Sequence, residues 1–272
     1  MYKAFSYAKI NLFLHILSKR DDGYHNINSL FTRVSLCDYI SVEKADAFII
    51  KSNIKSLEDK NNLIYKVYAK LKKIYSIPPI EVNLYKNIPL GSGLGGGSSN
   101  AAVFLNILDL WFDLGLTIND KKEILSDISS DAIYFLYKGS RIISGKGENV
   151  SRNILLPKFN ILLIKPPFDI STRDIYNSGL IQYSNNKEFK INYYLDLIGL
   201  MYNDLERPIF DRYPLLKNLK DMLINCGADN ALVTGSGSCV YGIFSSKYYL
   251  NRGYRLMKNK FRECNFYRLI NI

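Results

Sequence analysis

Apolar and polar residues alternate along the first part of the chain. In the stretch AFSYAKINLFLHIL, every second position from 8 to 16 is apolar, and Lys9 and Asn11 stand between them. A period of two is typical of a β-strand with one buried face. The pattern therefore predicts a strand that carries Lys9 and Asn11 on the same face. Asp22-Gly23 then predicts a tight turn, and two strand-like runs after it predict an opening β-meander or hairpin.

Segments with a helical spacing of apolar residues follow, interleaved with further strands. The pattern predicts helices over 61–75, 98–116 and 121–129. It predicts strands over 80–85, as a pair within 132–150, and in the apolar runs within 157–171 and 230–244. This mixture indicates an α+β fold. A second layer or domain is expected to begin near residue 153, which divides the chain into 1–152 and 153–272.

The segment PLGSGLGGGSSNA, residues 89–101, joins a predicted strand to the start of a predicted helix and holds five of the chain's 17 glycines. The first turn of a helix presents N–H groups without intrahelical partners, and the helix dipole is positive there. Glycine lets the backbone approach a ligand because it has no Cβ atom. The context favours an anion-binding loop, typically for phosphate, over a plain linker or a structural turn.

Three well-known glycine-rich motifs do not account for this loop. A Walker A motif is absent, because Gly145-Lys146-Gly147 lacks the final Ser or Thr. The pattern G-x-G-x-x-G is present, but another helix is predicted after the loop's helix, where a dinucleotide-binding unit would have a strand. Protein kinases require H-R-D and D-F-G segments, and neither occurs in this chain.

Composition narrows the class of protein. The 272 residues are 47% hydrophobic, which suffices for a real core, and the net charge is +11. Lysine and arginine are dispersed, so an anionic substrate explains the charge as well as a nucleic acid does. The four cysteines and two histidines show no metal-ligand spacing, and reduced thiols in a cytoplasmic protein are expected. Neither a signal peptide nor a membrane-spanning segment is predicted.

The glycine-rich segment resembles the phosphate-binding motif of the GHMP small-molecule kinases. The stretches AKINLFLHI and DDGYHNI narrow the resemblance to the branch that phosphorylates 4-diphosphocytidyl-2-C-methyl-D-erythritol in the non-mevalonate isoprenoid route. The resemblance continues, in the family's order, through SSDAIYFLYKG, KPPFDIST, MYNDLE and TGSGSCVYGIF. It implies a two-domain GHMP kinase fold with an N-terminal ATP domain, a smaller C-terminal domain and the active site in the cleft between them.

The resemblance also assigns roles to residues. It implies Lys9 and Asp131 as catalytic residues, since an ammonium offsets charge near the γ-phosphate and a carboxylate takes the hydroxyl proton. It implies that ATP, with Mg²⁺, is bound by Pro89, Leu90, Gly91, Ser92, Gly93, Leu94, Gly95, Gly96, Gly97, Ser98 and Ser99. Ser98 and Ser99 have a second interpretation as helix caps.

For the substrate, the resemblance implies that Tyr24 stacks on the cytosine and that His25 hydrogen-bonds its edge. Asn11, Asn203, Asp204, Gly235 and Gly237 complete the expected substrate-binding set. Asn11 has an alternative as an ordinary polar strand residue, His25 as a structural histidine, and the two glycines as turn residues.

Two segments depart from the family pattern. Around the aspartate the family usually reads G-A-D-V-P, whereas this chain reads Ser-Ser-Asp-Ala-Ile over residues 129–133. The family can also carry an aromatic residue before its Asn-Asp pair, where this chain has Met201, with Tyr202 one position later. The placement of Asp131 and the second wall of the cytosine pocket are therefore open at this point.

Two alternative functions remain. One is a GHMP kinase for another alcohol, such as mevalonate or homoserine, and DDGYH argues against it. The other is a basic nucleic-acid-binding module with a related fold, and the presence of Lys9, Asp131 and the glycine-rich loop argues against it. We expect a small-molecule substrate, no nucleic-acid or membrane partner, and a monomer or weak homodimer.

Overall fold

The structure, a computed structural model, describes residues 1–185 and 191–272. The chain forms two compact units that interleave along the sequence. Unit 1 comprises Met1–Ala8, Leu36–Ile88 and Gly95–Lys138, and unit 2 comprises Lys9–Ser35, Pro89–Leu94 and Gly139–Ile272. The expected boundary after residue 152 falls within unit 2.

Two long strands, β1 (Tyr2–Lys19) and β2 (His25–Lys44), contribute residues to both units. Gly23, at a φ of +82°, forms the tight turn between them, as the sequence predicts. The expectation of two separate strands after this turn is wrong, because residues 25–44 form the single strand β2. Residues 27–32 are all buried, and the extended backbone continues past them to Lys44.

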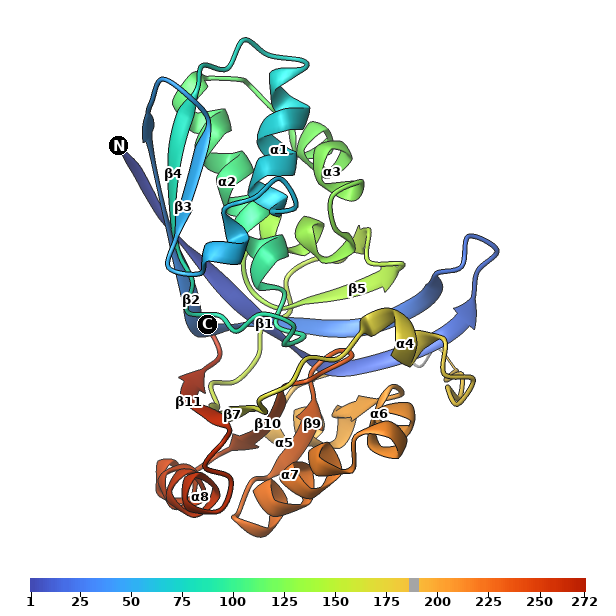
Figure 1. The fold of residues 1–272 in the computed structure, drawn as a ribbon. Helices are drawn as coiled ribbons and strands as arrows, with labels where there is room; N and C mark the ends of the chain where they lie inside the picture. Colours follow the sequence, from blue (N-terminus) through green and yellow to red (C-terminus); the bar gives the residue numbers. More distant parts are fainter. Residues whose placement is uncertain (186–190) are drawn as a thin grey trace. The chain divides into compact units, whose positions relative to one another are not determined.

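Unit 1 packs helices on one side of a sheet whose strand order is β3-β4-β2-β1 (Figure 1). Strand β4 is antiparallel to β2 and parallel to β3. Apolar side chains of α1 and α2 fill the core between the helices and the sheet, among them Val67, Leu71, Phe104 and Leu108. The remaining elements of this unit are β3 (Ile49–Ser52), η1 (Lys55–Leu57), α1 (Leu63–Lys72), β4 (Ile80–Tyr85), α2 (Gly96–Phe112), α3 (Ile118–Ser126) and η2 (Ser130–Leu136).

The apolar run at 132–136 belongs to a 3-10 helix, η2, and not to the first strand of the expected pair. Its side chains Ala132, Ile133, Tyr134 and Phe135 are all at most 3% exposed. A short run that is buried on every side has no alternation, so periodicity does not distinguish a strand from a helical turn. Beyond it, β5 (Arg141–Gly145) and β6 (Asn149–Val150) do form an antiparallel pair.

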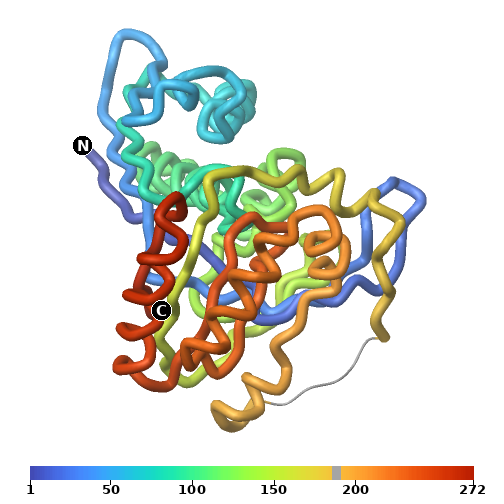
Figure 2. Tube along the Cα trace, turned by 60° about the horizontal axis from the view of Figure 1, so that its bottom comes forward, coloured from blue at the N-terminus to red at the C-terminus, as the bar shows by residue number. Residues whose placement is uncertain are grey.

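Unit 2 contains a four-stranded sheet of order β11-β7-β10-β9, with every neighbouring pair antiparallel. Strand β7 lies inside this sheet, and Ile161 to Ile164 are fully buried, which fits the continuous apolar run in the sequence. Helices α7 and α8 lie side by side against the sheet (Figures 1 and 2). Besides β5 and β6, the unit contains β7 (Asn160–Lys165), α4 (Thr172–Tyr176), α5 (Tyr194–Leu200), β8 (Tyr202–Asn203), α6 (Glu206–Arg212), α7 (Pro214–Asn225), β9 (Asn230–Val233), β10 (Val240–Phe244), α8 (Lys247–Lys260) and β11 (Asn265–Ile270).

Within the described ranges, none of the helices combines the length and the apolar character needed to cross a lipid bilayer.

Candidate active site

The N-terminus of α2 in unit 1 has no side-chain cap. Gly95 is its N-cap residue, at a φ of +68°, and provides no side-chain hydrogen bond to the first turn. The first turn also contains no acidic residue. The early N–H groups and the positive end of the dipole are therefore not neutralised by a local carboxylate. Gly97, within this turn, is exposed. The arrangement suits the phosphates of a nucleotide.

Ser98 and Ser99 lie inside the first turns of α2 and do not cap it, so their interpretation as helix caps is wrong. The Ser98 hydroxyl lies 2.7 Å from the hydroxyl of Ser129. The Ser99 hydroxyl accepts a hydrogen bond of 2.7 Å from Ser6. Both side chains thus tie the start of α2 to other parts of unit 1.

Asp131 is the second residue of η2 and is half-buried. The hydrogen bond between Ser129 and Ser98 connects this segment to the first turn of α2. Ser129 stands where the family usually has glycine, but its φ of −165° is extended backbone that any residue adopts. Ile133 stands in place of the proline and is buried. Residues 129–133 therefore adopt this conformation without the glycine and the proline that the family usually has there.

The earlier part of the glycine-rich loop, Pro89–Leu94, belongs to unit 2. A Cβ atom on Gly93 would lie 2.3 Å from the carbonyl oxygen of Thr234. One on Gly91 would lie 2.4 Å from Cγ of Asp169. These two glycines therefore allow close packing within the protein. The sequence suggests a different reason for them, the approach of the backbone to a ligand.

The loop segment Pro89–Leu94 is hydrogen-bonded to the segment TGSGSC, residues 234–239, and to strand β1. The N–H of Cys239 donates to the carbonyl of Ser92 at 3.3 Å, and the N–H of Lys9 donates to the carbonyl of Leu94 at 3.0 Å. Ser92 also closes its own turn, because its hydroxyl donates to the carbonyl of Pro89. Leu90 is 39% exposed.

Lys9 is 3% exposed, and its ammonium donates to Oδ1 of Asn11 at 2.8 Å. The ammonium also lies 4.5 Å from the centroid of the Phe31 ring. Asn11 is held in turn, since its Nδ2 donates to Ser29 and its Oδ1 accepts from Thr234. The expectation that Lys9 and Asn11 share one face is confirmed.

Gly235 has a φ of +59°, and a Cβ atom there would lie 3.5 Å from Oδ1 of Asn11 and 3.8 Å from Nζ of Lys9. The loop that contains it thus lies beside this pair. Gly237, at a φ of +88°, lies in the same loop and packs near Ile170. Thr234 is not among the residues that the sequence predicts for the site, although the segment TGSGS was the available signal.

The side chains of Asn203 and Asp204 hydrogen-bond to backbone groups of unit 2. The Nδ2 atom of Asn203 donates to the carbonyls of Val233 and Gly235, at 2.8 and 2.9 Å. The carboxylate of Asp204 accepts from the N–H of Ile16 and from the hydroxyl of Ser184. Both side chains are at most 5% exposed, so they brace the loop and strand that surround Lys9 and Asn11.

Tyr24 and His25 follow the turn between β1 and β2. Tyr24 is 54% exposed, whereas His25 is 6% exposed. Burial lowers the pKa of His25 below its ordinary value of 6.5, and the charge of Lys19 acts in the same direction. The imidazole is therefore neutral at pH 7, with one nitrogen that donates and one that accepts.

Two tyrosine rings lie near His25. Its ring centroid lies 5.1 Å from that of Tyr176 and 6.4 Å from that of Tyr183. Tyr202 stacks on a different ring, that of His15, at 5.6 Å, and Met201 is buried. Tyr176 has no signal in the sequence, because it is an isolated tyrosine in the short helix α4, remote in sequence from His25.

Among residues 1–185 and 191–272, no group of three or more histidine, cysteine, aspartate or glutamate side chains is placed to hold a metal ion.

Family models and curated relatives match this chain over most of its length. The family described as "GHMP kinases N terminal domain" matches residues 62–139, and "GHMP kinases C terminal" matches residues 192–263. A 4-diphosphocytidyl-2-C-methyl-D-erythritol kinase of Caldanaerobacter subterraneus subsp. tengcongensis is 37% identical over 263 residues, 93% of this chain and 91% of that protein. The enzyme of the same name from Bacteroides fragilis is 34% identical over 250 residues, 89% of this chain and 91% of its own.

Solved structures share the fold. A crystal structure of 4-(cytidine 5'-diphospho)-2C-methyl-D-erythritol kinase matches with a TM-score of 0.81 and 24% identity, and covers 98% of this chain and 99% of that one. The mevalonate kinase of Methanococcus jannaschii matches with a TM-score of 0.72 and 14% identity, over 100% of this chain and 98% of its own. The fold is therefore common to kinases with different alcohol substrates.

Proposed function

Because the chain belongs to the 4-diphosphocytidyl-2-C-methyl-D-erythritol kinase family, a branch of the GHMP kinases, we propose that it phosphorylates this same alcohol from ATP. The group that is phosphorylated is the 2-hydroxyl, and the reaction is a step of the non-mevalonate route to isoprenoid precursors. The observation that carries the proposal is the 37% identity over 93% of the chain.

The first turn of α2 binds the phosphates of ATP in this proposal. Gly95 leaves the first turn without a side-chain cap, and Gly97 is exposed, which supports this role. The backbone N–H groups at the start of α2 donate to phosphate oxygens, and the helix dipole adds attraction for negative charge. Residues 89–94 are proposed to complete the nucleotide loop, with their glycines selected in part for packing against Thr234 and Asp169.

Asp131 and Lys9 are the proposed catalytic residues. The carboxylate of Asp131 accepts the proton of the substrate hydroxyl, and the ammonium of Lys9 offsets charge that develops at the transferred phosphoryl group. The hydrogen bond from Lys9 to Asn11 supports an orienting role for Asn11. Catalysis in this family of reactions consists of positioning and electrostatic stabilisation, without a covalent enzyme intermediate.

Tyr24 and His25 are proposed to recognise the cytosine. The exposed ring of Tyr24 offers a face for stacking, and the neutral imidazole of His25 offers a hydrogen-bonding edge. The proximity of Tyr176 to His25 supports Tyr176 as a further aromatic contact. Asn203, Asp204, Gly235 and Gly237 would then act mainly by shaping the loop and strand beside Lys9 and Asn11.

We propose that Mg²⁺ enters with ATP. Its charge neutralises phosphate oxygens in phosphoryl transfer. The hydroxyls of Ser98 and Ser99 are oxygen donors of the hard type that Mg²⁺ prefers. We also propose a cytoplasmic protein, monomeric or weakly dimeric; the four free cysteines support a reducing compartment.

Product analysis tests the proposed function. Purified protein is incubated with Mg-ATP and 4-diphosphocytidyl-2-C-methyl-D-erythritol, and the products are followed by ³¹P NMR. We expect a new phosphomonoester signal to appear together with ADP. Coupling between this phosphorus and carbon 2 of the product should place the phosphate on the 2-hydroxyl. ADP formation without a new phosphomonoester would contradict the assigned acceptor.

A further inference from the structure

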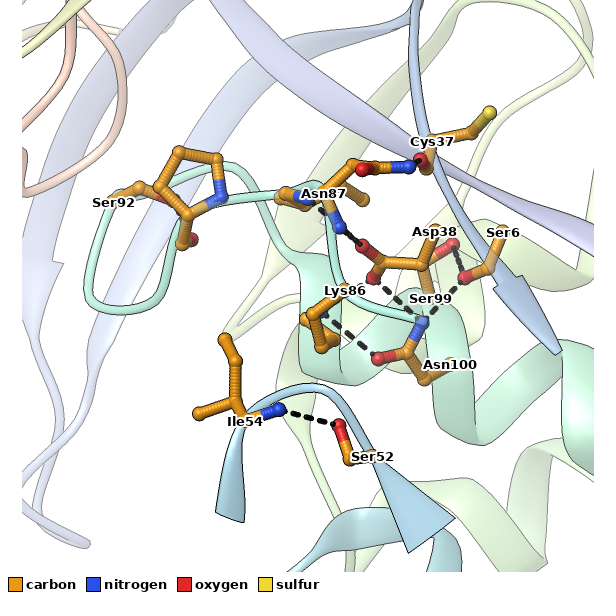
Figure 3. A network of polar contacts seen from close by, with 12 residues as sticks. Ser6, Cys37, Asp38, Ser52, Ile54, Lys86, Asn87, Ser92, Ser99 and Asn100 are labelled. Carbon is orange, nitrogen blue, oxygen red and sulfur yellow. Dashed lines mark hydrogen bonds and ion pairs between the residues drawn. The ribbon is translucent and has the colours of Figure 1, made fainter. Parts of the chain in front are cut away.

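A buried polar network in unit 1 connects three strands or strand ends to the start of α2 (Figure 3). At its centre the carboxylate of Asp38, which is fully buried, pairs with the ammonium of Lys86. The carboxylate also accepts the N–H groups of Asn87 and Ile88, each at 2.8 Å. A fourth donor, Nδ2 of Asn100, lies 2.9 Å away. These four donors all lie in unit 1, and together they compensate the negative charge of Asp38.

Asn100, on α2, connects the ion pair to Ser6. Its Oδ1 accepts from the Lys86 ammonium at 3.1 Å, and its Nδ2 donates to the Ser6 hydroxyl at 2.9 Å. The Ser6 hydroxyl donates in turn to the hydroxyl of Ser99 at 2.7 Å. Because an ammonium can only donate, the amide of Asn100 is oriented with Oδ1 toward Lys86 and Nδ2 toward Ser6. Ser99 accepts the last hydrogen bond of this chain.

The network joins the two chain segments on either side of the loop that is proposed to bind ATP. Lys86 to Ile88 precede the loop directly, and Ser99 and Asn100 follow it on α2. Gly96 fits closely against the first segment, since a Cβ atom there would lie 2.9 Å from Cγ2 of Ile88 and 3.1 Å from Nζ of Lys86. A loop whose ends are fixed has fewer conformations to lose when a ligand binds.

The composition of the network argues for a role in positioning. Burial lowers the pKa of Lys86, and the attraction of Asp38 opposes that shift only in part. A buried ion pair often contributes less stability than apolar side chains of similar volume. The sheet and helices around it bury many apolar residues, and these form the hydrophobic core of the unit. Directed hydrogen bonds provide something that apolar packing does not, namely a fixed register between the two segments.

We propose that Asp38, Lys86, Asn100 and Ser6 position the start of α2 relative to the segment before the glycine-rich loop, and thereby set the affinity for the triphosphate of ATP. The four residues act through Gly96, Ser99 and the backbone of the loop ends, and they are positioning residues. The inference deepens the proposed function and rests on it, because it assigns the loop to ATP.

The test compares two charge-neutral double variants. Lys86→Met with Asp38→Asn removes the ion pair of the network. Lys121→Met with Asp109→Asn makes the same two changes in an ion pair of 2.7 Å near the other end of α2, whose side chains are 16% and 11% exposed. For each protein we measure the free energy of unfolding by denaturant, and the Kd values of a non-hydrolysable ATP analogue with Mg²⁺ and of the cytidine-containing substrate.

We expect the first double variant to bind the ATP analogue about tenfold or more weakly, the scale of a disturbed positioning network, with the substrate Kd nearly unchanged. The control should lose stability without losing affinity for the analogue. Wild-type affinity in the folded first variant would overturn the inference. Equal weakening in the control would also overturn it, because the effect would then be a general loss of stability.

Ser6→Ala gives a second, milder variant that keeps the ion pair and interrupts only the step from Asn100 to Ser99. We expect about threefold or more weaker binding of the ATP analogue, again with the substrate Kd retained. If the first double variant does not fold, unchanged affinity in Ser6→Ala overturns the inference. A wild-type protein that binds no ATP analogue would instead contradict the proposed function, and the two failures are thereby distinguished.

Discussion

The ammonium of Lys9 donates to Oδ1 of Asn11 at 2.8 Å, two positions further along the same face of β1. This contact directs a buried positive charge, and Thr234 and Ser29 hold the asparagine that receives it. A charge that is oriented before the reaction costs no reorganisation at the moment of phosphoryl transfer. The contact therefore links a pattern visible in the sequence to a proposed catalytic role.

Replacing Lys9 by Met should lower kcat by about 10²-fold or more, and raise the KM of the substrate much less. Methionine retains an unbranched apolar stem beside Phe31, so the packing changes little. Steady-state kinetics with both substrates varied is the measurement. If only KM changes, Lys9 binds the ground state and does not act on the transition state.

Asp131→Asn should reduce turnover by about 10²-fold or more, the usual scale for loss of a general base, with ATP binding nearly intact. The amide has nearly the shape of the carboxylate, and Asp131 is half-buried, so η2 should keep its structure. Single-turnover rates and the Kd of an ATP analogue separate the two effects. Near-normal turnover would remove Asp131 from the mechanism.

Gly97→Ala provides the cleanest probe of the nucleotide loop. Gly93 and Gly95 have positive φ, and Gly96 lies against Ile88, so changes there strain the fold itself. At Gly97 an added Cβ atom would lie 3.6 Å from Leu63, an ordinary contact, and alanine should stabilise the helix by about 0.5–1 kcal/mol.

Because Cβ atoms tilt toward the helix N-terminus, this methyl group should nevertheless hinder phosphate and weaken ATP binding by several fold. Calorimetric titration with an ATP analogue and thermal unfolding measure the two properties. Unchanged affinity in a stable Gly97→Ala protein would mean that phosphate does not approach this part of α2.

The parts of the fold that the sequence predicts correctly have a clear period and local signals. The alternation around Lys9 and Asn11 predicts β1, and the glycine-rich segment before an apolar run predicts the start of α2. The run from Ala132 to Phe135 is mispredicted, because full burial erases the alternation. Such errors arise where the surroundings of a segment decide its conformation.

The site is predictable where a residue belongs to a motif, and is otherwise hidden in long-range contacts. Asp38, Lys86 and Ser6 are ordinary polar residues in the sequence, and Ser6 bonds Asn100 across 94 positions. Tyr176 reaches His25 in the same way. No local pattern encodes such pairs, since they depend on how the strands and helices pack.

His25 should also make stability depend on pH. Its pKa is lowered in the folded protein, so on acidification the unfolded chain takes up the proton first. The contribution of the neutral ring is fully present above about pH 6.5 and is lost as the pH falls from there toward the lower folded-state pKa. Denaturant unfolding at about pH 7.5 and about pH 5.5 should show a smaller difference in His25→Gln than in wild type. An equal difference would assign the pH dependence to other groups.

If His25 bonds the polar edge of cytosine, His25→Ala should cost the cytidine substrate about 1–3 kcal/mol, because buried base groups lose a partner. The measurement is kcat/KM for the cytidine substrate and its uridine counterpart, in wild type and variant, with ATP saturating. Wild type should prefer cytidine, and the variant should lose much of that preference. A preference that survives in a folded His25→Ala protein would assign recognition of the base to other residues.

The most direct test of the assigned function is a comparison of kcat/KM for ADP formation with 4-diphosphocytidyl-2-C-methyl-D-erythritol, mevalonate and homoserine, under identical Mg-ATP conditions. The fold alone does not separate these alcohols, because a mevalonate kinase matches this chain with a TM-score of 0.72. We expect the cytidine-containing alcohol to be preferred by about 10³-fold or more, the scale reached when a site is built to hydrogen-bond a group that its competitors lack. A comparable or higher value for mevalonate or homoserine would contradict the account.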